Sequence, residues 1–267
     1  MYNDYFVIDS HCHIYPEKIA AKAVEATDKF YGVSSDNLGT TSHLIETYKK
    51  VGIDHAVVQS VATTPKQVRS INKFIADAVN NSLGFFTGLG TLHPDCEDFN
   101  EETDYIVDLG LKGVKLHPDI QNFKMDTARL FEMYEICEKK GLVMLIHTGD
   151  KRYDNSNPDR VLNVLKSFPD LTVIGAHFGG WSVWEEAAEK LCGFKNFYVD
   201  CSSSFQFAEN ADFKKIIMKY GTDKVLFASD YPMWDAKDEL ETLFSFGFSK
   251  EDMTRMLSGN AKKIFNI

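Results

Sequence analysis

The sequence predicts an α/β protein that folds as a single (β/α)8, TIM-like barrel. The chain has 267 residues, a length that barrel folds reach as one domain, so residues 1–267 are expected to form one unit. Eight short apolar segments alternate with longer amphipathic ones, and after the first interval they recur at about 30 residues, the length of one strand-helix unit. An open doubly wound sheet is the alternative, but no glycine-rich nucleotide loop accompanies these segments.

The eight apolar segments are short, rich in Val, Ile, Leu and Phe, and do not alternate strictly with polar residues. This pattern is typical of strands that are buried on both faces of a parallel sheet. The expected strands are Phe6–Ser10, Ala56–Val61, Phe85–Thr91, Gly113–His117, Leu142–His147, Leu171–His177, Phe197–Cys201 and Val225–Asp230.

Helical patterns lie between these strands. Lys66–Ser82 carries apolar residues at steps of three and four. Asp126–Lys140 does the same, with its first residue as the expected N-cap and Gly141 as the C-cap. Pro158–Phe168 begins with a proline at the first helical position and follows Asn157, a second expected N-cap.

The first strand is followed by an insertion, residues 15–41, which makes the first interval longer than the others. Its first part, Pro16–Phe30, is expected to be helical, and Tyr31–Thr41 has the composition of a loop. Because the insertion leaves the end of the barrel at which sites form, we expect a lid or a pocket wall, with Tyr15 facing the substrate. A surface decoration that packs against the outer helices is the alternative.

Composition and charge exclude several classes of partner. The net charge of −10 disfavours nucleic acid and anionic membrane surfaces. No apolar run approaches the roughly 18 residues of a membrane helix, and the acidic start, Met1–Asp4, does not resemble a signal peptide. The five cysteines form no CxxC pair. We therefore expect a cytoplasmic protein with reduced thiols and a small-molecule substrate, with homo-oligomers left open.

Histidines and one aspartate follow the ends of the expected strands, where the active sites of barrels form. His11 and His13 share a parity, so both can face the barrel mouth while Cys12 points away. His147, His177 and Asp230 end three other strands. Neutral imidazole and carboxylate are good ligands for Zn²⁺ and related ions, so the pattern predicts a metal site.

These strand ends resemble the amidohydrolase superfamily, specifically the amidohydrolase-related family 2, which includes decarboxylases and hydrolases. The resemblance extends from the first strand to the last helix. The matching segments are Val7–His13, Gly113–Pro118, His147–Gly149, Phe168–Leu171, His177–Gly180, Phe227–Pro232 and Gly259–Ala261.

The resemblance implies that His11, His13, His147 and Asp230 hold one divalent ion, with Zn²⁺ expected and Mn²⁺ as the alternative. Asp230 and His177 would then be the catalytic side chains, with His177 as a metal ligand instead if a second ion is present. Relatives with two metals bridge them by a carboxylated lysine on the fourth strand, where this chain has Lys115. We expect an unmodified lysine that pairs with a carboxylate or with the substrate.

Substrate contacts are expected from five residues near the strand ends: Lys115, His117, Trp181, Arg152 and Tyr15. An arginine in the loop after the fifth strand could hold a carboxylate by two hydrogen bonds, which suits an anionic substrate. The alternative is that Arg152 and its neighbour Lys151 are a solvated pair in a loop.

We expect a metal-dependent hydrolase that attacks an amide, ester or lactone with a metal-activated water. The alternative is a non-oxidative decarboxylase of the same family. A nuclease of the TatD type would need a glutamate on the fourth strand, which has Lys115 and His117 instead. The intact set of histidines argues against a barrel that has lost its chemistry.

Overall fold

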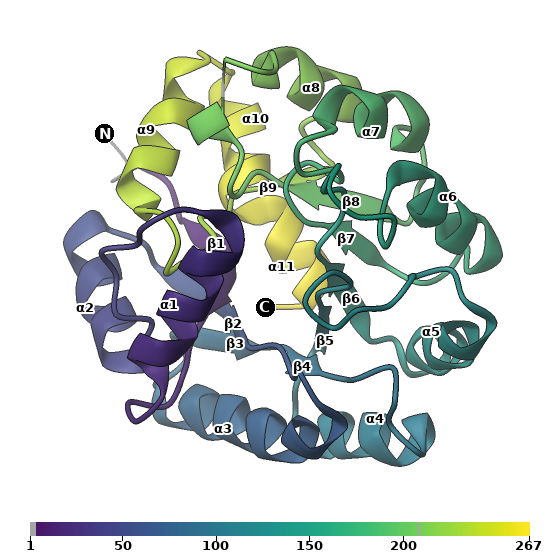
Figure 1. Ribbon diagram of the computed structural model, residues 1–267. Helices are drawn as coiled ribbons and strands as arrows, with labels where there is room; N and C mark the ends of the chain where they lie inside the picture. Colours follow the sequence, from purple (N-terminus) through teal and green to yellow (C-terminus); the bar gives the residue numbers. More distant parts are fainter. Residues whose placement is uncertain (1–3, 208) are drawn as a thin grey trace.

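A computed structural model describes residues 4–207 and 209–267 as a ring of parallel strands surrounded by helices (Figure 1). The strands are β1 (Ile8–His13), β2 (His55–Gln59), β3 (Phe86–Gly88), β4 (Gly90–Thr91), β5 (Gly113–Leu116), β6 (Val143–Ile146), β7 (Val173–Gly175), β8 (Phe197–Asp200) and β9 (Val225–Leu226). Within each of two sheets, β1-β2-β3 and β4 to β9, every strand pairs in parallel with the next, which is the order of a barrel.

Two junctions join the sheets β1-β2-β3 and β4 to β9 into one ring. The expected strand Phe85–Thr91 is interrupted at Leu89, whose N–H still donates to the Val58 carbonyl at 2.9 Å. On the other side, the Ser10 N–H donates to the Phe227 carbonyl at 3.0 Å. The prediction of a single (β/α)8 barrel is therefore confirmed, with β3 and β4 together as its third strand.

Helices surround the barrel in the order that the sequence predicts. They are α1 (Ala20–Tyr31), α2 (Thr41–Val51), α3 (Val68–Asn81), α4 (Phe99–Asp108), α5 (Ala128–Lys140), α6 (Pro158–Ser167), α7 (Trp184–Leu191), α8 (Phe213–Tyr220), α9 (Ala236–Ser245), α10 (Lys250–Thr254) and α11 (Asn260–Phe265). Across the described ranges, the search for a helix of membrane-spanning length and hydropathy finds no candidate.

The helix ends test the expected caps. Gly141 ends α5 in the left-handed region, and Asn157 accepts a hydrogen bond from the Arg160 N–H at the start of α6, as predicted. The prediction of Asp126 as a cap is wrong, because α5 begins after Thr127. The Asp126 carboxylate instead accepts hydrogen bonds from Arg160 and Asn163 on α6.

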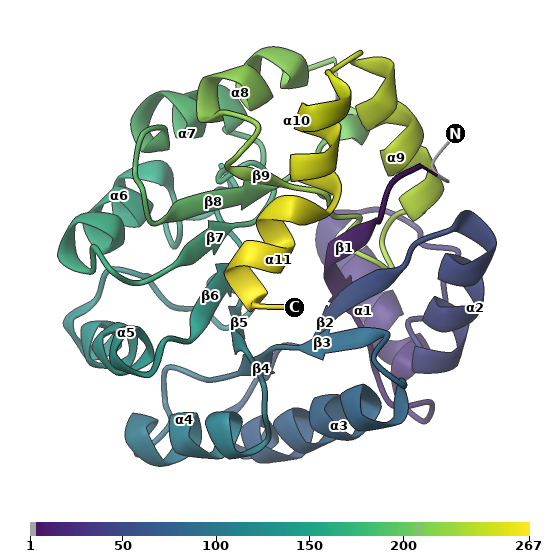
Figure 2. The ribbon, with the colours of Figure 1, turned by 180° about the vertical axis from the view of Figure 1, so that it is seen from behind.

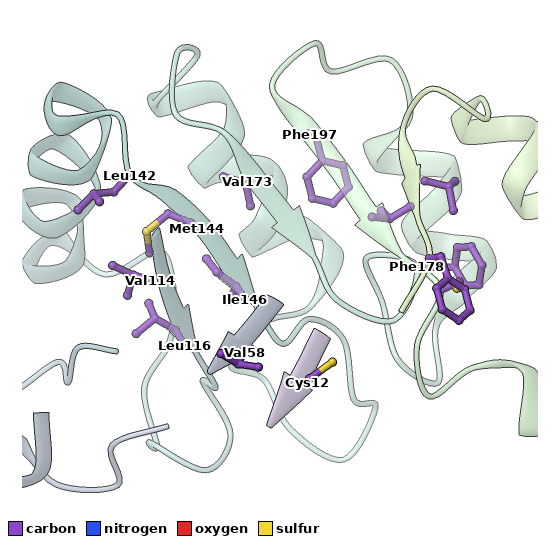
Figure 3. Packing of buried hydrophobic residues seen from close by; sticks show 14 of the residues in the cluster. Cys12, Val58, Val114, Leu116, Leu142, Met144, Ile146, Val173, Phe178 and Phe197 are labelled. Atoms are coloured by element: carbon purple, nitrogen blue, oxygen red, sulfur yellow. The ribbon is translucent and has the colours of Figure 1, made fainter. Parts of the chain in front are cut away.

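The core has two layers because side chains alternate along each strand. Leu145 of β6 points into the barrel, where α11 closes the end opposite to α1 (Figure 2). Its neighbours Met144 and Ile146 point outward, among the side chains that pack between strands and helices (Figure 3). Cys12 of β1 belongs to this outer layer, so its thiol faces α2 and lies 3.3 Å from the Tyr48 hydroxyl.

Residues 15–41 contribute to the cavity at the carboxyl ends of the strands, and Figure 1 shows α1 on the β1 and β2 side of the ring. The helix begins at Ala20, four residues later than Pro16. Its carboxyl end is held by two contacts with the barrel loops. The Tyr31 hydroxyl lies 2.7 Å from His117 Nε2, and Arg152 donates to the Phe30 carbonyl at 3.0 Å.

Gly149 joins the loops after β6 and β7, and we expect Gly149→Ala to destabilise the barrel strongly. Its φ is +89°, and an added Cβ would lie 2.4 Å from the Trp181 backbone nitrogen. Strain and overpacking together should cost about 2–5 kcal/mol, and thermal unfolding should shift downward by roughly 5–15 °C. Gly141→Ala is the matched control, because its φ is also positive but its Cβ meets open space among the described residues. Equal shifts in the two variants would contradict this prediction.

Candidate metal centre and active site

Three donor atoms meet where β1 and β9 end. His11 Nε2 and His13 Nε2 lie 3.2 Å apart, because residues two apart in a strand point the same way. Asp230 Oδ1 lies 3.2 Å from His11 Nε2 and 3.5 Å from His13 Nε2. Two imidazole nitrogens and a carboxylate oxygen at these separations form a set that could hold one divalent ion.

The neighbours of His11 fix its tautomer. Asp200 Oδ2 lies 2.9 Å from His11 Nδ1 and can only accept when ionised, so Nδ1 carries the proton. Burial raises the pKa of Asp200, but its interactions with His11, His177 and Ser202 outweigh burial and hold that pKa below its usual range. Lys115 Nζ, which can only donate when charged, lies 3.0 Å from His11 Nε2. Nε2 therefore has a lone pair, which accepts from Lys115 in this structure.

His177 is held in the same way at the end of β7. Its Nδ1 lies 3.0 Å from the Ser202 carbonyl oxygen, which only accepts, so Nδ1 donates and the Nε2 lone pair is free for the cavity. That Nε2 lies 3.0 Å from His147 Nδ1. Burial lowers the pKa of His177 to about 4, so the ring is neutral at pH 7.

On its other side, His147 faces a buried carboxylate. His147 Nε2 and both oxygens of Asp119 lack a hydrogen bond of ordinary length within the described ranges, yet His147 Nε2 and Asp119 Oδ2 are 3.6 Å apart. A proton on Nε2 would satisfy both groups after a small approach. It would also leave the lone pair of Nδ1 facing that of His177, which is unfavourable unless a cation lies nearby.

The protonation of the other histidines and the orientation of Asp230 also suit a cation. Burial lowers the pKa of His13, His117 and His147 well below the usual value, so these rings are in the neutral form that binds metals. Asp230 Oδ2 accepts a hydrogen bond of 2.6 Å from the Ser203 hydroxyl, which leaves Oδ1 directed at the two β1 histidines. The set of His11, His13 and Asp230 therefore fits one divalent ion, while His147 lies in a second group of possible ligands with His117 and Asp119.

A cavity of about 520 Å³ adjoins these groups. Lys115, His117 and Tyr15, three of the expected substrate contacts, line it together with the histidines. Trp181 lines a smaller hollow beside it, shared with His147, His177 and Asp230. The structure thus brings four predicted substrate contacts around the candidate metal centre.

Arg152 is placed differently. Its guanidinium makes a two-point ion pair with the buried Asp150, with the shortest contact at 2.7 Å, and also binds the Phe30 carbonyl. It contacts the outer hollow at Trp181 rather than the main cavity. In this structure Arg152 connects α1 to the loop after β6, and its role in substrate binding stays a prediction.

Sequence reasoning missed Asp200, Asp119 and Tyr31. Asp200 could have been found, because it is the second-last residue of the predicted strand Phe197–Cys201 and has the parity of an inward residue. Asp119 follows β5 in a loop, and its approach to His147 depends on how the loop folds. Tyr31 reaches His117 across 86 residues of sequence, and no spacing in the chain indicates that contact.

Comparisons with known proteins agree with this geometry. The family model described as amidohydrolase matches residues 8–267. A 2-amino-3-carboxymuconate-6-semialdehyde decarboxylase of Dictyostelium discoideum is 26% identical, and the match covers 61% of this chain. The chain spans about half of that relative, since the match covers 55% of it.

Solved structures share the fold. A 5-carboxyvanillate decarboxylase from Sphingomonas paucimobilis has a TM-score of 0.75 at 18% identity, covering 98% of this chain and 99% of its own. A dihydroxybenzoic acid decarboxylase from Polaromonas sp. JS666, with bound manganese and the inhibitor 2-nitroresorcinol, has a TM-score of 0.70 at 17% identity, covering 98% and 97%. The family model, which matches almost the whole barrel, shows that this chain belongs to the amidohydrolase family.

Proposed function

We propose that this protein is a metal-dependent, non-oxidative decarboxylase of a small carboxylate. The observation that carries the proposal is the position of Lys115, a buried cation whose Nζ lies 3.0 Å from His11 Nε2 at the closed end of the cavity. A lysine and a divalent ion side by side would hold a carboxylate and a neighbouring oxygen together. The decarboxylases among the relatives support this reaction over hydrolysis, the main expectation from the sequence.

In this proposal His11, His13, His147 and Asp230 hold one ion. The ion, when bound, supplies positive charge that orients the substrate oxygens and stabilises negative charge that develops as the carbon–carbon bond breaks. Imidazole and carboxylate ligands suit both Zn²⁺, which the sequence favoured, and Mn²⁺, which a relative of the same fold contains. We expect about one ion per chain, with Lys115 unmodified.

Asp119 gives a test of this ligand set. A metal-bound histidine usually donates its other N–H to a carboxylate or carbonyl, and Asp119 is placed to accept from His147 Nε2. In Asp119→Asn, the amide can donate to Nε2 and favour the tautomer that places a proton on Nδ1. We expect metal affinity to fall by about 10- to 100-fold, measured by competition with a chelator.

The matched control is Asp98→Asn. Asp98 accepts from the Glu101 N–H at the start of α4, and asparagine caps helices equally well. Unchanged metal affinity in Asp119→Asn, in a protein with wild-type circular dichroism, would contradict the assignment.

The chain's own groups account for the rest of the reaction. The Lys115 ammonium binds a carboxylate oxygen and holds the leaving group in place. The bond between the carboxylate and its carbon breaks, its electron pair remains on the carbon, and CO₂ leaves. Asp230, oriented by Ser203, takes a proton from water and delivers it to that carbon, and Nε2 of the neutral His177 accepts a hydrogen bond from a substrate hydroxyl. Tyr31 and α1 limit the access of water.

The test is a panel of ortho-hydroxylated aromatic carboxylates, with matched anilides and lactones, assayed with protein loaded with Mn²⁺ or Zn²⁺. We expect one CO₂ released for each carboxylate lost. Hydrolysis of anilides or lactones without CO₂ release would refute the decarboxylase and support the hydrolase.

Lys115→Met should raise KM for the carboxylate by about 10- to 100-fold, the value of a lost charge-assisted hydrogen bond. Metal content should stay near one ion per chain, because Lys115 is not a ligand. Lys112→Met, an exposed lysine at the start of the same strand, is the control. An unchanged KM in Lys115→Met would contradict carboxylate binding by Lys115.

A further inference from the structure

The cavity at the candidate metal centre continues away from the strand ends, between α1 and α3. This extension, here named the apolar arm, is lined by Ile19, Ala23 and Phe30 on one side and by Ile71 and Phe74 on the other. The same cavity contains the polar end formed by the histidines, Lys115 and Asp230. One continuous space therefore has a polar end and an apolar end.

The arm is too long for a single ring. Tyr31, at the polar end, contacts His117, whereas Ile19 lies twelve residues earlier along α1. At the rise of an α-helix those two positions are about 18 Å apart. A cavity of roughly 150 Å³ holds a benzene ring, and the volume here is about 520 Å³.

The polar groups along the arm are already paired. The Thr27 hydroxyl donates to the Ala23 carbonyl at 3.1 Å, and the Ser70 hydroxyl donates to the Gln67 carbonyl at 2.9 Å. Gln67 Oε1 accepts from the Thr63 N–H at 2.8 Å. The Lys and Asp side chains among the described residues that line the cavity, Lys115 and Asp230, both lie at its polar end. The arm therefore offers hydrophobic contact.

The arm also leaves apolar surface uncovered. Ile19 is 50% exposed, and Ala23, Phe30, Ile71 and Phe74 are each partly exposed. A contiguous apolar surface that continues into an active-site cavity indicates a ligand group that covers it.

We propose that the substrate carries an apolar substituent, an alkyl chain or a second ring, on the side opposite its reacting carboxylate, and that the apolar arm binds this substituent. The substrate class is thus a lipophilic carboxylate with an oxygen next to the carboxylate. This inference rests on the proposed function for one point, the binding of the carboxylate at the polar end.

The experiment measures binding, so it does not depend on turnover. The probe is 2-nitroresorcinol, whose nitro group has two oxygens in the place of a carboxylate, and its 5-methyl, 5-propyl and 5-pentyl homologues. Dissociation constants are measured by calorimetry with Mn²⁺-loaded protein. Each buried methylene should tighten binding by about three- to fourfold, so that the pentyl compound binds roughly 200- to 1,000-fold more tightly than the parent.

Ala23→Phe fills the arm and should remove this gain while leaving the parent compound unaffected. Ala21→Phe is the matched control, because Ala21 lies on the same helix but lines a separate hollow on the surface. If Ala23→Phe does not fold, Ile71→Asn makes the arm polar without filling it and should reduce the gain by at least tenfold.

Two results would overturn the proposal: affinities that do not depend on chain length, or equal losses in Ala23→Phe and Ala21→Phe. If no nitroresorcinol binds, the proposed polar end is refuted, and hexan-1-ol then tests the arm by saturation-transfer NMR. Binding of hexan-1-ol that Ala23→Phe removes supports the arm, whereas no binding of hexan-1-ol overturns it.

Discussion

Asp230→Asn is expected to lower kcat by about 10²- to 10⁴-fold, the usual contribution of a general acid or base. The amide cannot deliver the proton, and it is a weaker metal ligand than a carboxylate. The fold should persist, because Asp230 has a φ of +62° and asparagine tolerates this left-handed region better than most residues. The measurements are steady-state kinetics on a carboxylate that the wild type decarboxylates, with circular dichroism to confirm folding.

Asp235→Asn is the matched control for this variant. Asp235 is the N-cap of α9 and accepts a hydrogen bond from the Lys237 N–H, a role that asparagine also fills. Its activity should equal that of the wild type. Full activity in Asp230→Asn would remove Asp230 from the proposed mechanism.

Replacing His11 and His13 together by alanine is expected to release the metal. The two Nε2 atoms are 3.2 Å apart and supply two of the three donor atoms at the end of β1 and β9. The remaining ligands, His147 and Asp230, come from separate loops and should not retain the ion through dialysis. Elemental analysis of the purified protein should fall from about one ion per chain to near zero, with activity lost in parallel.

His55→Ala is the control for metal loss by a histidine substitution. His55 bonds the Gly84 carbonyl and the Thr87 hydroxyl at the opposite end of the barrel, and its removal should leave metal content unchanged. Metal retained at full stoichiometry in the double variant, with the protein folded, would show that the ion lies elsewhere.

The candidate site could be predicted in part because its ligands follow strand ends. His11, His13, His147, His177 and Asp230 each stand where an apolar segment stops, and a closed barrel brings all its strand ends to one face. The partners that orient these ligands are different. Asp200 could be inferred by strand parity, but Asp119 and Tyr31 reach the site through a loop and an inserted helix.

The tertiary structure also decided two features of the insertion and its neighbourhood. It places α1 at the mouth as one wall of the cavity, in agreement with the lid or pocket wall expected from the sequence. It also pairs Arg152 with Asp150 and the Phe30 carbonyl, an arrangement that a charge pattern in one loop does not indicate.

The sequence by itself determined the barrel, its eight strand-helix units, the side of each strand that faces inward and the residue types at the mouth. These properties follow from local periodicity, because the side-chain period of a strand and the length of a strand-helix unit are written along the chain. Only the tertiary structure decided which histidine nitrogen faces the cavity, which carboxylate holds each ring, and where the cavity extends. Those properties depend on contacts between residues that are distant in sequence, such as His11 with Asp200 and Tyr31 with His117, and on packing directions that no local pattern specifies.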